Sequence, residues 1–312
     1  MIKRTLCFSN PAALSLTNGQ LVVRLLDPSR YNAQHGTKYE PTTTIPIEDI
    51  GIIVLDHQQI TLTHAVMAAL LQNNAAVITC DARHLPIGLL LPLEGNTLQS
   101  ERFHDQIEAS QPLRKQLWQQ TVSQKIRNQA AVLNMVRNCQ VSNMLVWANN
   151  VRSGDADNLE GRAAAYYWSQ LLAQQPGWTR GQEGPWPNAL LNYGYAVIRA
   201  MVARALVASG MLPTLGIHHH NRYNAYCLAD DIMEPYRPYV DRMVMDMLRQ
   251  WPNAEEINTE MKRQLLQLPV VDVIINGQRS PMMIAISQTT ASLYKCYSGE
   301  MRKIVYPEIP MP

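Results

Sequence analysis

The sequence predicts an α+β protein in which a small β-rich domain precedes a larger all-α domain. Up to Gly95-Asn96, short alternating apolar runs separated by turn residues are typical of β-strands. After this point the apolar spacing is helical. With 312 residues, 46% of them hydrophobic, the chain can bury two cores. We expect an N-terminal domain over residues 1–96, a linker over 97–107 and a C-terminal domain over 108–312.

A β-hairpin is expected in the N-terminal domain. Asn18-Gly19 separates the apolar runs 14–16 and 21–25, and this dipeptide accepts the positive φ angles of a tight hairpin turn. Further strands are predicted over Ile50–Leu55, Ala75–Cys80 and Pro86–Pro92, with Thr63 as the N-cap of a short helix ending at Leu71.

The sequence indicates neither export nor membrane insertion. The start MIKRTLCFSN lacks an apolar core of signal-peptide length, and we expect no run to approach the roughly 18 apolar residues of a membrane span. The five cysteines are odd in number and include no C-x-x-C pair, which favours neither a disulfide framework nor a cysteine metal site. We therefore predict a cytoplasmic protein.

A long basic helix is predicted at the start of the C-terminal domain. Between Ala109 and Gly154 there are six basic residues and no acidic one. The apolar residues recur at helical spacing, and we expect Lys125 and Arg127 on the polar side. Such a stretch attracts phosphate, although a solvated helix face has the same composition.

Histidines and carboxylates are concentrated between Thr214 and Asp241, in a chain that is only 17% charged. If a helix begins near Asn224, Glu234 shares a face with Asp231 and with Asp230. Neighbouring carboxylates repel unless a cation lies between them. Several oxygen ligands with one imidazole suit Mg²⁺ or Mn²⁺. The alternative interpretation is a solvated helix start with surface histidines.

Other helices complete the predicted domain. One begins at Asn158 and places Glu160 in its first turn, either as a partner of the helix dipole or as a ligand for a cation. Another runs from Asn188 to about Ser209, where Asn192 and Tyr193 either contact a sugar-phosphate backbone or only cap and pack the helix. Residues 257–300 are predicted to be helical with a turn at Asn276-Gly277, followed by a docked or unstructured tail.

These residues resemble the CRISPR-associated adaptation integrases, the catalytic subunits of spacer acquisition, and most closely the version found in type II systems. The resemblance covers nearly the whole chain. Its most specific motifs are L-E-G-R-A-A around Glu160, N-x-x-L-N-Y-G-Y from Asn188, L-G-I-H-H-H-N from Leu215 and L-A-D-D-I-M-E-P-Y-R-P-Y-V-D from Leu228.

The resemblance implies a β-sandwich-like N-terminal lobe that pairs two copies, and a helical catalytic lobe. In the family, a glutamate, a histidine and a further acidic residue bind the metal. By motif these fall on Glu160, His219 and Glu234, with Asp231 as a supporting carboxylate. His219 is chosen by its spacing from the glycine of G-x-x-H, although His218 and His220 flank it.

The function implied is that of a DNA endonuclease and integrase dependent on Mg²⁺ or Mn²⁺. It joins the 3′-hydroxyl ends of captured DNA to the CRISPR repeat by transesterification. We expect contacts with DNA from Lys125, Arg127, Arg137, Asn192, Tyr193 and Arg237.

The implied partners are double-stranded DNA, both prespacer and repeat, a second copy of this chain, and a small second adaptation protein that bridges two homodimers. The resemblance also implies that other type II components assist, and the expected location is the prokaryotic cytoplasm, at the nucleoid. Two other functions stay open: a non-catalytic DNA-binding scaffold, and a hydrolase that uses the histidine run as a zinc site.

Overall fold

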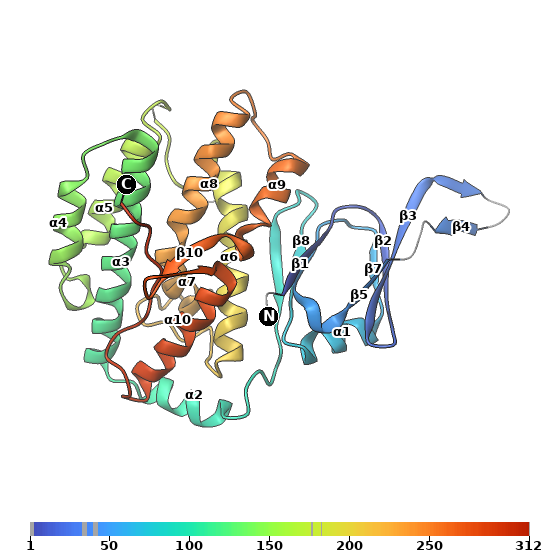
Figure 1. Ribbon diagram of the computed structural model, residues 1–312, viewed down its shortest axis with the longest axis horizontal. Coiled ribbons are helices and arrows are strands. Elements are labelled where there is room, and N and C mark those ends of the chain that lie inside the picture. The colour runs from blue at the N-terminus through green and yellow to red at the C-terminus, as the bar shows by residue number, and fades with distance from the viewer. Residues whose placement is uncertain (1–2, 33–35, 40–42, 176, 182, 312) are drawn as a thin grey trace. The chain divides into compact units, whose positions relative to one another are not determined.

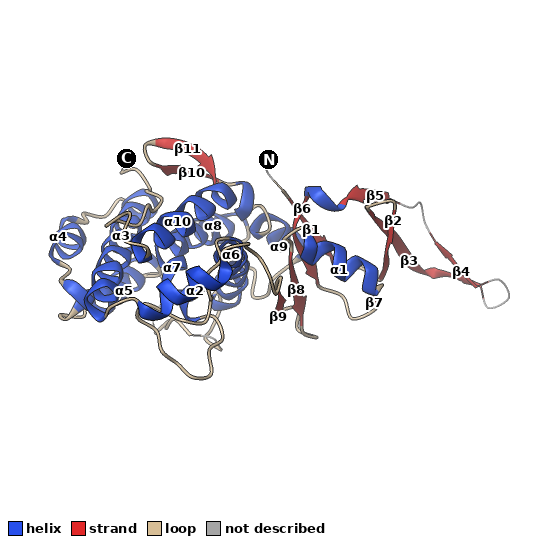
Figure 2. Cartoon of the chain, turned by 90° about the horizontal axis from the view of Figure 1, so that it is seen from below, coloured by secondary structure: helices blue, strands red, loops and turns tan. Residues whose placement is uncertain are grey.

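The computed structural model describes residues 3–32, 36–39, 43–175, 177–181 and 183–311. Contacts divide the chain into two compact units, unit 1 (Met1–Gly95) and unit 2 (Asn96–Pro312). Both strands and helices are present (Figures 1 and 2), so the predicted mixture of α and β structure is confirmed.

Unit 1 contains two β-sheets. The first has the order β1-β6-β8-β9, and all its strand pairs are parallel except β8–β9. In the second, of order β4-β3-β2-β7, β5 also pairs with β3. The elements are β1 (Arg4–Phe8), β2 (Ala12–Thr17), β3 (Gln20–Asn32), β4 (Gly36–Tyr39), β5 (Thr43–Pro46), β6 (Ile50–Leu55), β7 (Ile60–Leu62), α1 (His64–Gln72), β8 (Ala76–Cys80) and β9 (Pro86–Leu90).

The predicted hairpin is confirmed. Thr17 of β2 pairs with Gln20 of β3 across Asn18-Gly19, which have φ angles of 50° and 71°. Both residues are therefore in the left-handed region that this dipeptide accepts. The strands predicted near residues 50, 75 and 86 are also present. Thr63 occupies the N-cap of α1, but its side chain makes no capping hydrogen bond.

One apolar core holds unit 1 together. It takes side chains from the first sheet, from the second sheet and from α1. The core includes Phe8, Leu14, Leu21, Ile53, Val66, Leu70 and Val77.

Unit 2 is built mainly of helices (Figure 1). Its longest helix, α3, packs against α4, α5 and α8, while α6 packs against α7, α8 and α10. The helices are α2 (Gln99–Glu108), α3 (Gln111–Arg137), α4 (Ser142–Asn150), α5 (Leu159–Leu171), α6 (Asn188–Ala208), α7 (Cys227–Met233), α8 (Arg237–Gln250), α9 (Thr259–Leu265) and α10 (Met282–Tyr297).

Two predictions for this part of the chain are wrong. The segment 97–107, expected to be a linker, lies largely in α2. Residues 272–281, expected to be helical apart from a turn, form a hairpin of β10 (Asp272–Ile275) and β11 (Gln278–Pro281) (Figure 2). Its turn is Asn276-Gly277, with φ angles of 51° and 73°, so this dipeptide acts here as it does in unit 1.

The expectation that no apolar run approaches membrane-spanning length is also wrong. By length and composition alone, α6, with its 21 residues, is long and apolar enough to cross a membrane. Most of this apolar stretch is, however, buried inside unit 2. The apolar composition of α6 is explained by its central position among the other helices.

Asn128 fastens the C-terminal segment to α3. This buried amide donates to the carbonyl oxygens of Pro235 and Pro307 at 2.7 and 3.1 Å. Its oxygen accepts from the backbone N–H of Ile309 at 3.0 Å and from the side chain of Gln124. All four hydrogen-bonding positions of the amide are used.

Replacing Asn128 with alanine should therefore destabilise unit 2 by about 3–5 kcal/mol, because several buried backbone groups lose their partner. All six tryptophans lie between Trp118 and Trp251, so denaturant unfolding followed by tryptophan fluorescence reports on unit 2. Asn150→Ala removes an exposed amide and should change stability by no more than about 0.5 kcal/mol. An equal loss of unfolding free energy in the two variants would show that Asn128 does not fasten the C-terminal segment to α3.

Candidate active site

Glu160 is fixed at the start of α5 by two side chains that cap the helix. The Asn158 carboxamide oxygen accepts from the N–H of Gly161 at 3.2 Å. The carboxylate of Asp155 accepts from the N–H groups of Leu159 and Glu160, both at 2.9 Å. These bonds satisfy donors that a helix start leaves free, and they determine where the Glu160 side chain begins.

Glu234 lies where α7 gives way to α8. A single 3₁₀ turn, η3 (Glu234–Tyr236), interrupts the helix that we expected to begin near Asn224, and α7 begins only at Cys227. The Glu234 carboxylate is buried. One of its oxygens, Oε1, lies 2.9 Å from Nε of Arg237, and Oε2 lies 2.6 Å from Nζ of Lys125.

The ammonium group of Lys125, on α3, joins the two glutamates. Its nitrogen lies 2.6 Å from Oε1 of Glu160 and 2.6 Å from Oε2 of Glu234. Burial by itself lowers the pKa of Lys125, but the two carboxylates outweigh it, so the pKa is raised and the group is charged at neutral pH. Two of the predicted ligands thus meet at a single cation.

A loop carrying the three histidines closes around Asp231. This fully buried carboxylate accepts from the N–H groups of Ile217 and His218 at 2.7 and 3.0 Å. Gly216 makes the tight approach possible, since a Cβ atom there would lie 2.4 Å from the carbonyl oxygen of His219 and 2.8 Å from Oδ2 of Asp231. Any larger residue would open the loop.

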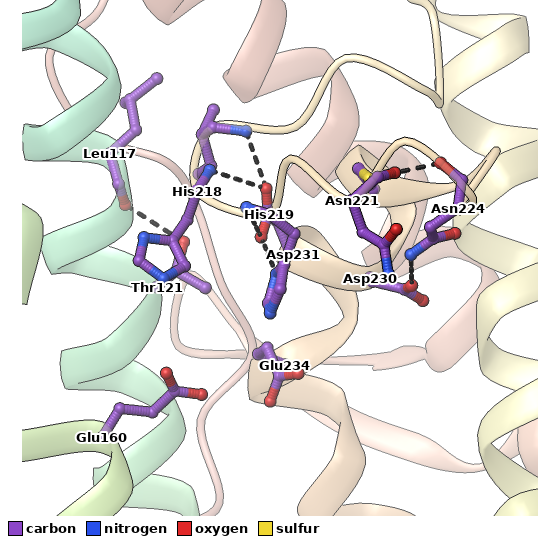
Figure 3. A network of polar contacts seen from close by, with 12 residues as sticks. Leu117, Thr121, Glu160, His218, His219, Asn221, Asn224, Asp230, Asp231 and Glu234 are labelled. Carbon is purple, nitrogen blue, oxygen red and sulfur yellow. Dashed lines mark hydrogen bonds and ion pairs between the residues drawn. The ribbon is translucent and has the colours of Figure 1, made fainter. Parts of the chain in front are cut away.

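Asp231 also orients the imidazole of His219 (Figure 3). Nδ1 of His219 lies 2.5 Å from Oδ1 of Asp231, and this hydrogen bond raises the pKa of the histidine. A carboxylate that accepts from Nδ1 leaves Nε2 available as a ligand. Glu234 and Glu160 are the other carboxylates that act electrostatically on this ring.

The two neighbouring histidines are placed differently. The ring of His218 stacks on Trp118, with 4.2 Å between the ring centroids, and burial lowers its pKa. His220 lines a cavity of about 220 Å³ together with His218, Arg114 and Lys115. Of the three, His219 has the contacts that suit a ligand held by a supporting carboxylate.

The adjacent carboxylates of α7 point to different partners (Figure 3). Asp230 binds Arg199 through two bonds of 2.6 and 2.8 Å and accepts from the Asn224 amide. Asp231 is occupied by the histidine loop. The expected pairing of Asp230 with Glu234 on one helix face is therefore wrong. Asp231 has contacts typical of a residue that positions a ligand.

Among the described residues, no three His, Cys, Asp or Glu side chains lie close enough to share a metal ion in this conformation. The predicted ligands therefore do not form a closed set, although Glu160 and Glu234 both act electrostatically on His219. The group that lies between the two glutamates is the ammonium of Lys125.

Arg237 connects the site to a buried network that the sequence did not reveal. Its guanidinium lies over the ring of Tyr195, 4.7 Å from the centroid. The hydroxyl groups of Tyr195 and Tyr167 both donate to Asp241. Burial raises the pKa of Asp241 to about 6, although these two bonds act in the opposite direction. Arg237, expected to contact DNA, is thus engaged with Glu234 and Tyr195.

Other residues expected to bind DNA are also occupied within unit 2. Tyr193, expected to lie near the DNA, is 0% exposed in this structure. Arg137 donates to the carbonyl oxygen of Leu171 through two nitrogens, and Asn192 accepts from Arg180 at 2.7 Å. These side chains hold helices and loops together.

Lys125 and Arg127 lie on opposite sides of α3, so the prediction of a shared polar face is wrong. Residues two apart on an α-helix are separated by roughly 200°. Lys125 is only 8% exposed and points to the glutamates, whereas Arg127 is exposed. Arg127 lines a hollow of about 510 Å³ with Arg302 and Lys303, which the sequence did not single out, and with amide and hydroxyl side chains.

A family model described as CRISPR associated protein Cas1 matches residues 6–268, most of the chain. The chain belongs to the Cas1 family. The CRISPR-associated endonuclease Cas1 of Neisseria meningitidis serogroup C (strain 8013) is 36% identical over 311 residues, covering 99% of this chain and 97% of the relative.

Two solved structures share the fold of this Cas1 chain. A casposase bound to integration product aligns over 97% of this chain and 92% of its own, with a TM-score of 0.77 and 18% identity. A Cas6-RT-Cas1–Cas2 complex aligns over 99% of this chain and 36% of its own, with a TM-score of 0.73 and 18% identity. The expected family is thus confirmed.

In this Cas1 protein, Asp231→Asn should lower the pKa of His219, because a neutral amide stabilises the imidazolium less than a carboxylate does. NMR titration of the imidazole signals in metal-free protein measures the change. Asp230→Asn is the matched control, since it removes the same charge from a carboxylate that pairs with Arg199. A fall of the same size in both variants would exclude a specific role for Asp231.

Proposed function

We propose that this protein is a divalent-metal-dependent DNA endonuclease and integrase of CRISPR adaptation. The observation that carries the proposal is the meeting of Glu160 and Glu234 at a single cation, beside a histidine whose Nε2 is left available. The similarity to a CRISPR-associated endonuclease supports the activity, and the fold shared with a casposase bound to integration product supports strand joining.

The side chains fit a divalent ion. Glu160, Glu234 and His219 would supply oxygen, oxygen and nitrogen ligands, which suit Mg²⁺ or Mn²⁺ better than the sulfur- and nitrogen-rich sites typical of zinc. When bound, the ion would stabilise charge on the reacting phosphate and orient the attacking oxygen. The imidazole of His218 stacks on Trp118. This contact disfavours a zinc site that would use His218 together with its neighbouring histidines.

The proposed reaction exchanges one phosphodiester for another. The 3′-oxygen of the captured fragment forms a bond to a phosphorus of the CRISPR repeat, and the bond from that phosphorus to the repeat's own 3′-oxygen breaks. No high-energy cofactor is required, because the number of phosphodiesters is unchanged. The contribution of the chain is to position Glu160 through the caps of α5, Glu234 through Arg237 and His219 through Asp231.

The proposed partners are double-stranded DNA and other proteins of adaptation. A solved complex that contains Cas1 and Cas2 has the fold of this chain in part of its length. We infer that residues 1–96 pair two copies of the chain, that residues 108–312 are catalytic, and that a Cas2-like protein bridges two such dimers. Assistance from type II components and a location at the nucleoid remain predictions.

Glu160→Gln and Glu234→Gln should each reduce strand joining by about 10²-fold or more, because one anionic ligand is lost. The assay uses a labelled DNA fragment and a plasmid bearing a repeat, with Mg²⁺ or Mn²⁺, and with and without the small partner protein. Glu256→Gln, which neutralises an exposed acid, is the control and should join strands at the wild-type rate.

The same experiment separates the competing functions. A non-catalytic scaffold predicts that DNA-dependent activity survives Glu160→Gln, whereas the integrase loses joining and keeps duplex binding. A zinc hydrolase predicts that activity removed by EDTA returns with Zn²⁺. Recovery with Mg²⁺ or Mn²⁺ but not with Zn²⁺ would reject it.

We also propose that the hollow around Arg127 contacts the DNA backbone. Its basic residues Arg127, Arg302 and Lys303 are exposed, and among its described lining residues there is no carboxylate. Amide groups on its walls are fixed by bonds to backbone oxygens, as in Gln119 to Val151 and Gln120 to Arg302. Exposed cations on walls fixed in this way suit phosphate, which binds without regard to base sequence.

Arg127→Glu should weaken duplex binding and reduce the slope of log affinity against log salt by about one, because one phosphate contact is lost. Fluorescence anisotropy at several salt concentrations measures both quantities. The control is Arg263→Glu, which reverses an exposed arginine on α9 outside the hollow. If the two variants give equal salt slopes, Arg127 does not contact the backbone.

A further inference from the structure

Lys125 occupies the position between two carboxylates that the proposed function assigns to a divalent ion. We propose that its ammonium group is an internal cation, which neutralises Glu160 and Glu234 in the metal-free protein and leaves this position when the metal ion binds. The inference rests on the proposed metal site and adds a residue that controls how strongly that site takes up metal.

The first argument is electrostatic. Two carboxylates brought close in a poorly hydrated part of unit 2 repel each other, and their burial has a free-energy cost that only a nearby cation offsets. Nζ of Lys125 lies at hydrogen-bond distance, 2.6 Å, from one oxygen of each. With the ammonium present, the two glutamates can remain ionised and in place before any metal arrives.

The second argument is steric. The oxygens covered by Lys125 are Oε1 of Glu160 and Oε2 of Glu234, while Arg237 holds Oε1 of Glu234. A Mg²⁺ ion requires oxygen ligands at about 2.0–2.1 Å, closer than an ammonium nitrogen can approach. The ammonium and the metal ion therefore cannot bridge the same two oxygens at once. The flexible stem of lysine permits it to withdraw.

The third argument is that the described geometry matches the ammonium-bound form. Glu160, His219 and Glu234 do not form a closed set of ligands among the described residues, although both glutamates contact the same nitrogen. A site arranged around an ammonium, with its longer contacts, is wider than a site arranged around a small divalent ion. Departure of Lys125 is the change that would let the ligands draw together.

As a consequence, Lys125 lowers the affinity of the site for a metal ion. Binding of the ion must displace one positive charge, so the apparent affinity reflects a competition between the ion and Lys125. A singly charged ion offers the carboxylates no more charge than the ammonium already provides. The competition therefore favours divalent ions.

The direct test compares Mn²⁺ binding by the wild-type chain and by Lys125→Met, using electron paramagnetic resonance of free Mn²⁺ without DNA. Methionine keeps much of the volume of the lysine stem but carries no charge. We expect Lys125→Met to bind Mn²⁺ about tenfold more tightly, since a competing charge is removed. Equal or weaker binding by Lys125→Met would overturn the proposal.

Lys295→Met is the matched control, because it removes one exposed lysine charge from α10 of the same unit. Its Mn²⁺ affinity should equal that of the wild type. A comparable gain in this variant would attribute the effect to net charge and would also overturn the proposal.

A second test needs no metal. In EDTA, Lys125→Met should lower the melting temperature, read by tryptophan fluorescence, by about 5–10 °C, because two carboxylates lose their shared partner. In the background Glu160→Gln the same change should cost clearly less, since one of the charges is already absent. Additive losses would show that Lys125 does not neutralise Glu160.

These outcomes are distinct from those that bear on the proposed function. If the wild type joins strands with Mg²⁺ or Mn²⁺ but Lys125→Met gains no affinity, the inference about Lys125 fails alone. If the wild type joins no strands with either ion, the proposed function fails, and the coupling between Lys125 and Glu160 still decides whether the lysine is their internal cation.

Discussion

The contact on which the site depends is the ammonium of Lys125 between Glu160 and Glu234. It brings together α3, α5 and the turn η3, which are distant in the sequence. Three charged groups are removed from much of their water, and the ammonium offsets the cost for both carboxylates because it lies within hydrogen-bond distance of each. The surrounding bonds serve this arrangement. The caps of α5 fix one glutamate, Arg237 fixes the other, and Asp231 sets the imidazole beside them.

The sequence revealed the anionic and imidazole members of this site but misassigned its cation. The resemblance to the family identifies Glu160 and Glu234, because each lies in a short, distinctive motif. Lys125 instead lies in a stretch of basic residues without acids, so its charge resembled those of its neighbours. Which side of α3 faces the glutamates depends on tertiary packing. Two residues of separation turn Lys125 and Arg127 in opposite directions, and the same limitation applies to Asp230 and Asp231, adjacent carboxylates with unrelated partners.

The fold shows the same limit. Asn18-Gly19 lies between clearly apolar runs, and its hairpin was predictable, whereas Asn276-Gly277 follows one apolar strand and precedes the polar β11. The turn itself was predicted, but the polar sequence of β11 gave no indication of a second strand. Helix α2 was missed for a related reason: Gln106 is its buried residue, and that amide bonds to Leu212 and Leu215 more than a hundred positions away. A helix fixed by polar tertiary contacts has little apolar periodicity to detect.

The two opposite faces of α3 carry basic residues in different electrostatic environments. The face that carries Lys125 meets carboxylates in a poorly hydrated interior, where distance and geometry determine whether charge is tolerated. The face that carries Arg127 is open to solvent, where attraction to phosphate is general and weakened by salt. An α-helix with its side chains is about 10 Å across, so a phosphate near Arg127 is not the phosphate at the glutamates. The proposed contact at Arg127 and the proposed reaction at the glutamates would therefore involve different phosphates. A loss of function at Arg127 would then mean weaker binding of DNA, whereas a loss at Lys125 would mean a disturbed glutamate pair.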